Sequence, residues 1–241
     1  MYIRRINRGF IIFTAFLFIM GGIYTMVFAV CQIPATEPVQ TDDAPAAFVD
    51  TVELPVFIPD TTLVVERIVS YDGHYVEDGS EDPVTGIAAL HLHNSGSTMV
   101  AACRVIVQLE MGLYRFEATC IPPGATVLVQ EKDRKQYCDM GIYAVGGSAS
   151  KAIKTDLNGD IICTQDFMAG LRLYNVSDED YEAVCISHKN FSHEENIYIG
   201  GITYVTYADS LNGGGRCDIW PVHFGAESKI VCITGNKMDA Q

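Results

Sequence analysis

The sequence has few basic residues and lacks the short motifs that mark familiar reactions. Gly-x-Ser-x-Gly, a zinc-binding His-Glu-x-x-His helix and a phosphate-binding glycine loop are all missing. Beyond Cys31 there are 30 acidic residues against 13 basic ones, a formal charge of −17. Such a surface would repel nucleic-acid phosphates, so we expect no nucleic acid as a partner. We assign no catalytic residue and expect no enzyme activity.

Helical periodicity is scarce beyond residue 60, and this predicts an all-β fold. Short runs rich in Val, Ile and Thr alternate with Gly, Pro, Asn and Asp, a pattern typical of strands and turns. The expected strands are Leu63–Tyr71, Ile87–His93, Met99–Leu109, Tyr114–Cys120 and Val127–Glu131.

One long apolar run stands at the N-terminus, from Phe10 to Val30. It carries no charge over 21 residues, enough to cross a bilayer as a helix. Arg4, Arg5 and Arg8 precede it, and the next basic residue is Arg67. The positive-inside rule therefore predicts a basic cytoplasmic tail of residues 1–9, membrane contact through residues 10–30 and an extracytoplasmic remainder.

Three interpretations of residues 10–31 remain open. The run is a retained transmembrane anchor, or a signal peptide cleaved after the small-residue pattern of Val27 and Ala29. In the third, Cys31 is lipidated, although Val30 stands where bacterial lipoproteins have Gly, Ala or Ser. The protein is thus expected in the cell membrane, or secreted if the run is cleaved.

The exported part is long enough for one large or two smaller domains. Residues 32–60 contain five prolines, which predicts a stalk. A repeated phrase then favours two domains: Asn94 ends a strand-like segment nine residues before Cys103, and Asn175 ends another ten residues before Cys185. We expect domains at 61–146 and 147–241, with a loop at Gly146–Ser150 between them.

Two hairpins are predicted within these domains. Met111-Gly112 is expected to turn the strand Ala101–Leu109 into Tyr114–Cys120. Later in the chain, Gly200–Ala208 is expected to pair back across the polar loop near His188–Asn196.

Two short motifs carry a family resemblance. Phe116–Val129, with its Pro122-Pro123-Gly124 turn, resembles the immunoglobulin-like modules of bacterial cell-surface proteins. The chain is also similar to exported proteins of Gram-positive bacteria that pair this phrase with a later Gly-Gly-Ile-Thr-Tyr, here Gly200–Tyr204. The resemblance implies immunoglobulin-like β-sandwiches, two in tandem, and transfers no activity. Leu211–Gly215 replaces the Pro-Pro-Gly phrase in the second domain.

Eight cysteines in an exported chain suggest disulfides. Cys103 and Cys120 are symmetric about Met111-Gly112, and Cys217 and Cys232 about Phe224-Gly225, so each pair would face across a hairpin. Cys138 and Cys163 form a third possible pair. The alternative is that these cysteines are buried as small apolar side chains.

One segment resembles the start of a calcium-binding loop. Asp156, Asn158 and Asp160 place oxygen ligands at alternate positions, and Asp166 would close the loop. Ile161 occupies the place of the usual glycine, so a polar β-turn is the alternative. We expect no cofactor unless this loop binds calcium.

We therefore expect a membrane-anchored extracytoplasmic protein that serves in binding, adhesion or envelope assembly, with a surface protein or envelope component as partner. One alternative is a structural subunit of a surface assembly, its open strand edge completed by a partner. The other is an exported hydrolase with dispersed catalytic residues.

Overall fold

The structure is a computed structural model that describes residues 51–138, 141–151, 156–165 and 170–238. The chain divides into two compact units, Met1–Phe48 and Val49–Gln241, and every described residue belongs to the second. The apolar run, Cys31, most of the expected stalk and Asp166 lie outside the described residues. Within them, no helix is long and apolar enough to cross a membrane.

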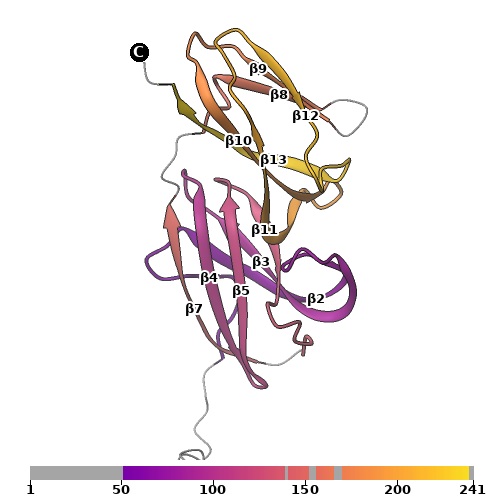
Figure 1. Cartoon of the computed structure of the whole chain (residues 1–241). Coiled ribbons are helices and arrows are strands. Elements are labelled where there is room, and N and C mark those ends of the chain that lie inside the picture. The colour runs from indigo at the N-terminus through magenta and orange to yellow at the C-terminus, as the bar shows by residue number, and fades with distance from the viewer. Residues whose placement is uncertain (1–50, 139–140, 152–155, 166–169, 239–241) are drawn as a thin grey trace, which may run out of the picture. The chain divides into compact units, whose positions relative to one another are not determined.

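The described residues form strands, turns and loops, without an α-helix (Figure 1). The predicted all-β class is confirmed, and each of the five predicted strands is present with somewhat shifted ends. The strands are β1 (Val56–Phe57), β2 (Leu63–Tyr75), β3 (Asp82–Asn94), β4 (Val100–Leu109), β5 (Gly112–Ile121), β6 (Thr126–Gln130), β7 (Ile142–Lys151), β8 (Ile161–Gln165), β9 (Leu171–Asn175), β10 (Tyr181–Ser192), β11 (Ile197–Ala208), β12 (Arg216–Ile219) and β13 (Ser228–Lys237).

The strands of this unit make three sheets. One has the order β1-β2-β3-β6-β11-β10-β13, and two three-stranded sheets have the orders β5-β4-β7 and β12-β9-β8. Among the described strands, β6 and β11 form the single parallel pair, at Val127↔Tyr198 and Leu128↔Ile199. That short pair joins the two halves of the long sheet.

The strand order repeats along the chain. In β2–β7, the first, second and fifth strands make one layer (β2-β3-β6) and the other three make another (β5-β4-β7). Strands β8–β13 repeat this order as β8-β9-β12 and β11-β10-β13. We call β2–β7 the first repeat and β8–β13 the second repeat. The long sheet thus combines one layer from each.

The two asparagines of the repeated phrase occupy equivalent places. Each ends a strand, β3 or β9, is buried, and donates its amide Nδ2 to three backbone carbonyls. For Asn94 these are Thr98, Ile121 and Pro122, at 2.9, 3.1 and 3.2 Å. For Asn175 they are Glu179, Leu211 and Asn212, at 2.7, 3.2 and 3.1 Å. In both repeats, the buried amide binds a carbonyl four residues later and two carbonyls of a distant turn. The two asparagines therefore stabilise equivalent corners.

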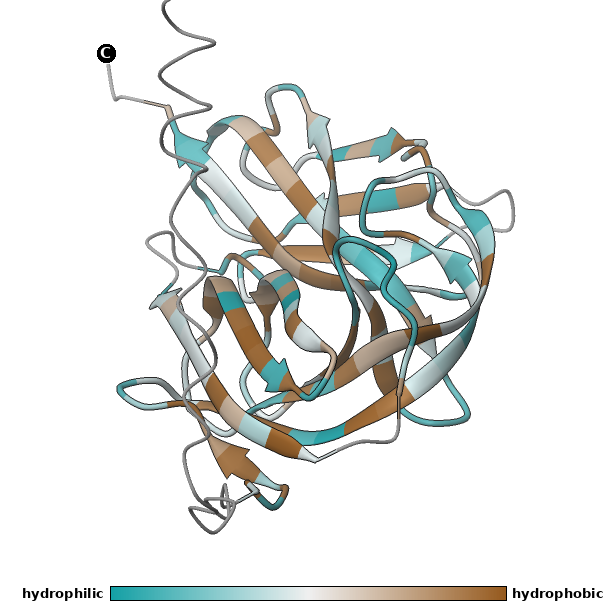
Figure 2. Cartoon of the chain, turned by 90° about the horizontal axis from the view of Figure 1, so that it is seen from below, coloured by the Kyte–Doolittle hydropathy of each residue, from teal (hydrophilic) through white to brown (hydrophobic). Residues whose placement is uncertain are grey.

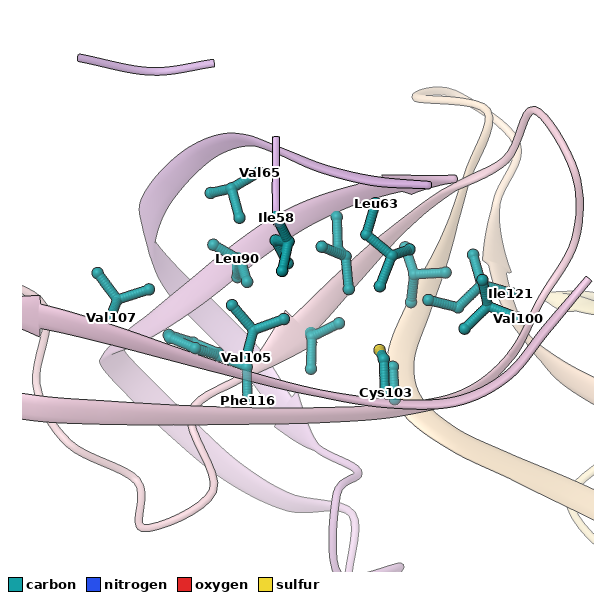
Figure 3. Packing of buried hydrophobic residues seen from close by; sticks show 14 of the residues in the cluster. Ile58, Leu63, Val65, Leu90, Val100, Cys103, Val105, Val107, Phe116 and Ile121 are labelled. Carbon is teal, nitrogen blue, oxygen red and sulfur yellow. The ribbon is translucent and has the colours of Figure 1, made fainter. Parts of the chain in front are cut away.

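Alternate side chains of the strands point inward and form two main hydrophobic cores. The first lies in the first repeat and also includes Phe191, Tyr198 and Val231 of the second repeat. In β4, Val105 and Val107 are fully buried, whereas Arg104 and Ile106, which alternate with them, are exposed. Hydrophobic and hydrophilic residues alternate in this way along many strands (Figure 2). Figure 3 shows the first core, where Val105 of β4 packs between the sheets. The second core contains the buried residues Ile161, Leu171, Leu173, Tyr181, Val184, Ile186, Ala208, Leu211, Phe224 and Ile233.

The end of the predicted stalk belongs to the first repeat's core. Val52 donates its N–H to Ile142 O of β7 at 2.6 Å, β1 pairs with β2, and Ile58 is 1% exposed within the core. The prolines masked this role in the sequence: Pro55 follows a cis peptide bond beside β1. For residues 51–60 the stalk prediction is wrong.

Two further predictions about local structure need correction. Gly146–Ser150, expected to be a loop between domains, lies in the second half of β7 and pairs with β4. The first hairpin forms, but Leu109 pairs with Gly112, so its turn is Glu110-Met111 rather than Met111-Gly112. The second predicted hairpin is confirmed: β10 and β11 pair across the turn at residues 193–196.

Candidate functional site

A buried lysine stands at the place where the two repeats meet. Lys189 lies in β10 next to a β-bulge and is 0% exposed. Its Nζ donates to three successive carbonyl oxygens of β11, those of Gly200, Gly201 and Ile202, at 3.2, 2.7 and 2.6 Å. Burial lowers the pKa of Lys189 to about 8, against the opposing effect of the Glu77 carboxylate. A charge held this far from water is costly, and such groups concentrate at functional sites.

Glu77 is the matching acid. Its Oε1 accepts the backbone N–H groups of Gly201 at 2.7 Å and Gln130 at 2.9 Å. Burial raises the pKa of Glu77, opposed by these two hydrogen bonds and by the charge of Lys189. The carboxylate therefore binds the first repeat, through β6, to the second, through β11.

Gly201 lies between these two charged groups. Its N–H binds Glu77 and its carbonyl accepts Lys189, as well as the Thr119 hydroxyl at 3.3 Å. A Cβ at this position would lie 1.9 Å from the carbonyl oxygen of Glu117 in β5. Only glycine allows β11 to approach β5 so closely. Thr203, two residues on, donates its hydroxyl to the Thr119 carbonyl at 3.1 Å.

A cleft of about 710 Å³ opens beside this junction. It lies over the outward-facing residues of β5, β4 and β7, together with Gly201–Thr203 of β11. Its floor has small side chains, and its lining includes Glu77, Ala102, Thr119, Ser148, Ser150 and Thr203. Arg104 and Lys132 also line it, and both form ion pairs with Glu117, the former at 2.8 Å. The cleft thus offers hydrogen-bond donors and acceptors of both charges.

A second cavity, of about 680 Å³, contains two cysteines. Cys120 near the end of β5 and Cys232 of β13 both line it, together with Asp156, Ser187 and Lys151. A hydrogen bond from Cys232 lowers the pKa of the Cys120 thiol to about 6, whereas the same contact and burial raise the pKa of Cys232. Both thiols are free in the structure.

A third feature is the aromatic stack around His188. This side chain is 0% exposed, lies 5.4 Å from the Tyr204 ring and meets Phe224 edge-on at 5.1 Å. Neither His188 ring nitrogen has a hydrogen-bond partner among the described residues. Burial, followed by the charge of His223, lowers the pKa of His188 to about 4. This histidine is held neutral and acts as an aromatic packing residue.

The predicted disulfide pairs do not face each other. In the hairpin Cys103 stands opposite Ala118, because the turn is one residue earlier than predicted, so Cys120 is out of register. Cys217 pairs with Leu173 in β9, whereas Cys232 pairs with Ser187 in β10, so the second pair lies in two different sheets. Cys138 and Cys163 are also free.

The predicted calcium ligands are occupied with bonds inside the fold. The Asp156 carboxylate accepts the N–H groups of Asn158 and Ile233, and Asp160 accepts the Tyr181 hydroxyl at 2.8 Å. Residues 158–160 form a turn, the alternative considered above. Within the described ranges, no group of three or more His, Cys, Asp or Glu side chains is placed to hold a metal ion.

Sequence reasoning did not find Lys189 or Glu77. The residues around a lysine in a strand do not indicate whether it is buried. The burial of Lys189 becomes evident only in the structure, where it binds the Gly201 carbonyl at the close approach of β11 to β5. The Gly200–Tyr204 motif was the one available signal, because paired glycines within a strand indicate close backbone contact. No protein-family model matches the chain, and no curated protein sequence matches it.

Proposed function

We propose that the chain is an extracytoplasmic binding protein, anchored at the membrane by residues 10–30, whose recognition surface is the 710 Å³ cleft between its repeats. The observation that carries the proposal is the cleft itself, lined by both repeats and stabilised by the bonds of Lys189 and Glu77. Binding sites form preferentially where two modules meet on a rigid scaffold.

The topology supports an immunoglobulin-like interpretation of each repeat. One layer contains the first, second and fifth strands and the other contains the fourth, third and sixth. A sandwich of two antiparallel layers with its core between them presents loops and outer faces for recognition, which is how immunoglobulin-like modules serve at cell surfaces. The fold here would display the cleft.

The chemistry of the cleft favours an extended peptide segment of an envelope protein as ligand. Small side chains such as Ser148 leave room for a chain to lie across the sheet face. Glu77 supplies an acceptor, and Arg104 and Lys132 supply donors, the two kinds of group that a peptide backbone needs. Electrostatic matching of this kind sets the register of a bound chain.

A binding assay tests the cleft. The full chain, displayed on cells, would be probed with an array of synthetic peptides that covers the exposed segments of the host's envelope proteins. Ser148→Trp fills the floor and is expected to weaken binding at least tenfold. Ser210→Trp, an exposed serine outside the cleft, is the matched control and should bind as wild type does. Equal binding by the Ser148→Trp protein would contradict the proposal.

Topology needs a separate test. Intact cells that carry the full chain would be treated with a membrane-impermeant maleimide, with and without prior lysis. Extracytoplasmic placement predicts that labelling of exposed engineered cysteines in the region after residue 50 is the same before and after lysis. Labelling that requires lysis would refute it.

A structural subunit is the second candidate, because β7 is an edge strand of its three-stranded sheet. Most of its side chains from Gly147 to Lys151 are exposed. Size-exclusion chromatography of the detergent-solubilised full chain over a hundredfold concentration range separates the two. Self-association would favour the subunit, and a constant monomer the binding protein.

A further inference from the structure

Two cysteines from different repeats lie side by side at the second cavity. Cys120 belongs to β5 of the first repeat and Cys232 to β13 of the second. They line the same cavity, and the contact between their side chains lowers the pKa of Cys120 and raises that of Cys232. Cys120 also packs against the first core, which includes Val231, the neighbour of Cys232. We propose that Cys120 and Cys232 are a redox pair whose oxidation forms a disulfide that links the two repeats.

The fold brings these two residues together across a long stretch of chain. Cys120 has a φ of 48°, an unusual value for a residue other than glycine, next to the Pro122-Pro123-Gly124 turn. Cys232 is 4% exposed and pairs with Ser187 in β10. Each thiol was a member of a different predicted hairpin pair, so the pairing follows from the contact between the repeats and not from either hairpin.

The two thiols have unequal reactivity. Cys120 is half-buried at the cavity, whereas Cys232 is buried. The hydrogen bond from Cys232, with further help from Thr203 and the charge of Lys189, lowers the pKa of Cys120 despite its burial. The thiolate is the nucleophile in disulfide exchange. Cys120 is therefore the attacking residue and Cys232 the resolving one.

The reaction consumes one disulfide oxidant, such as oxidised glutathione or the disulfide of a thiol oxidoreductase. The Cys120 thiolate attacks one sulfur of the oxidant, forms a mixed disulfide and releases the first oxidant thiolate, which takes up a proton. Cys232 then loses its proton and attacks Sγ of Cys120, which releases the second oxidant thiol. Two protein thiols are oxidised and one oxidant disulfide is reduced to two thiols.

The disulfide would fix the junction next to the cleft. Thr203 contacts both Thr119 and Cys120. Lys189 donates to the carbonyl of Ile202, the residue before Thr203. A covalent link between β5 and β13 would keep the two repeats in the arrangement that forms the cleft. The chemistry is independent of the proposed ligand. An extracytoplasmic location would supply the oxidant, because such compartments are oxidising.

Peptide mapping tests the pairing directly. All eight cysteines lie in different tryptic peptides: Cys120 in residues 116–132 and Cys232 in residues 230–237. The purified full chain would be incubated with oxidised glutathione, alkylated, digested and analysed by mass spectrometry. The expected product is peptide 116–132 joined to 230–237, which separates after reduction. Cys103→Ser should leave the product unchanged, and Cys120→Ser or Cys232→Ser should abolish it.

Two outcomes would overturn the proposal. One is that Cys120 joins another cysteine, for example Cys103, in the folded protein. The other is that both remain alkylated as free thiols under oxidant that converts a reference dithiol completely. Because the readout is a covalent product of the purified chain, its failure leaves the peptide-binding and topology assays intact, and the reverse also holds.

A second measurement does not depend on disulfide yield. The alkylation rate of Cys120 is followed against pH by the mass of peptide 116–132. Wild type should show a midpoint below the usual range of a thiol, and Cys232→Ala, which lacks the hydrogen-bond donor, should move it upward. An unchanged midpoint in a variant with an unchanged circular-dichroism spectrum would show that the two thiols do not interact.

Discussion

Replacing Lys189 by methionine tests whether a buried charge is held at the junction of the repeats. Burial lowers the pKa of Lys189 from 10.5 to about 8. At 1.36 kcal/mol per pKa unit, this difference corresponds to about 3 kcal/mol of unfolding free energy. Methionine has a similar length and no charge, so the variant keeps the packing and loses the titration.

The sign follows from the protons bound by each state. Between pH 8 and 10.5 the unfolded chain keeps the Lys189 proton that the folded chain has lost. The free energy of unfolding of wild type therefore rises as pH increases through this window. Below pH 8 both states hold the proton, so the difference between wild type and the Lys189→Met variant should be constant. By pH 10.5 the unfolding free energy of wild type should have increased by about 3 kcal/mol relative to that of the variant, compared with their difference below pH 8.

Urea unfolding of the compact unit Val49–Gln241 measures this difference at several pH values between 7 and 10.5, by far-ultraviolet circular dichroism with reductant present. Comparison with wild type at each pH cancels the titration of the tyrosines. Lys151→Met, which removes an exposed ammonium at the end of β7, controls for the loss of one charge. A difference that stays constant with pH would show that Lys189 is not desolvated and would remove the basis of the site.

Three further changes probe the same framework. Gly201→Ala should lower the free energy of unfolding by about 2–3 kcal/mol in urea titrations, because its Cβ meets a carbonyl at 1.9 Å; Gly146→Ala, with open space around it, should be neutral or slightly stabilising. The pKa of His188 is lowered to about 4, so the unfolded chain binds more protons than the folded chain between pH 6.5 and 4. The free energy of unfolding should therefore fall by up to about 3 kcal/mol as the pH decreases through this range, and His188→Phe should reduce this decrease in acid titrations. Asn175→Ala orphans three carbonyls and should cost about 2–3 kcal/mol in thermal or urea unfolding, and Asn94→Ala should cost about the same if the repeats are equivalent.

The parts of the fold that local pattern controls were predictable from the sequence. Alternation of apolar residues predicted β4 and β5, and the repeated asparagine phrase predicted that Asn94 and Asn175 each end a strand. These features depend on residues within one strand or one turn. Register was less secure, since a turn placed one residue late moves Cys120 away from Cys103.

The candidate site depends on contacts that no local pattern encodes. Glu77 and Gly201 are 124 positions apart, yet one hydrogen bond of 2.7 Å joins them. Burial of Lys189 results from the β11 strand that covers it, which sequence alone does not place. The Asp156 carboxylate of the predicted calcium loop likewise accepts the N–H of Ile233, a residue distant in the sequence.

The shared sheet explains why the unusual residues gather at one place. Within its own layer, β6 is paired only with β3, and β11 only with β10, so each would leave an open edge. Their parallel pairing closes both edges, but it covers only two residue pairs, Val127↔Tyr198 and Leu128↔Ile199. Beyond that point β11 leaves β6 and approaches β5, where the backbone groups of Gly200–Ile202 need other partners. Lys189, Glu77 and Thr119 supply them. Glu77 and Thr119 reach β11 from the first repeat, so their contacts exist only where the two copies meet, whereas Lys189 binds β11 from within the second repeat. The charged junction, the cleft and the cysteine pair are thus consequences of joining the repeats through a single sheet.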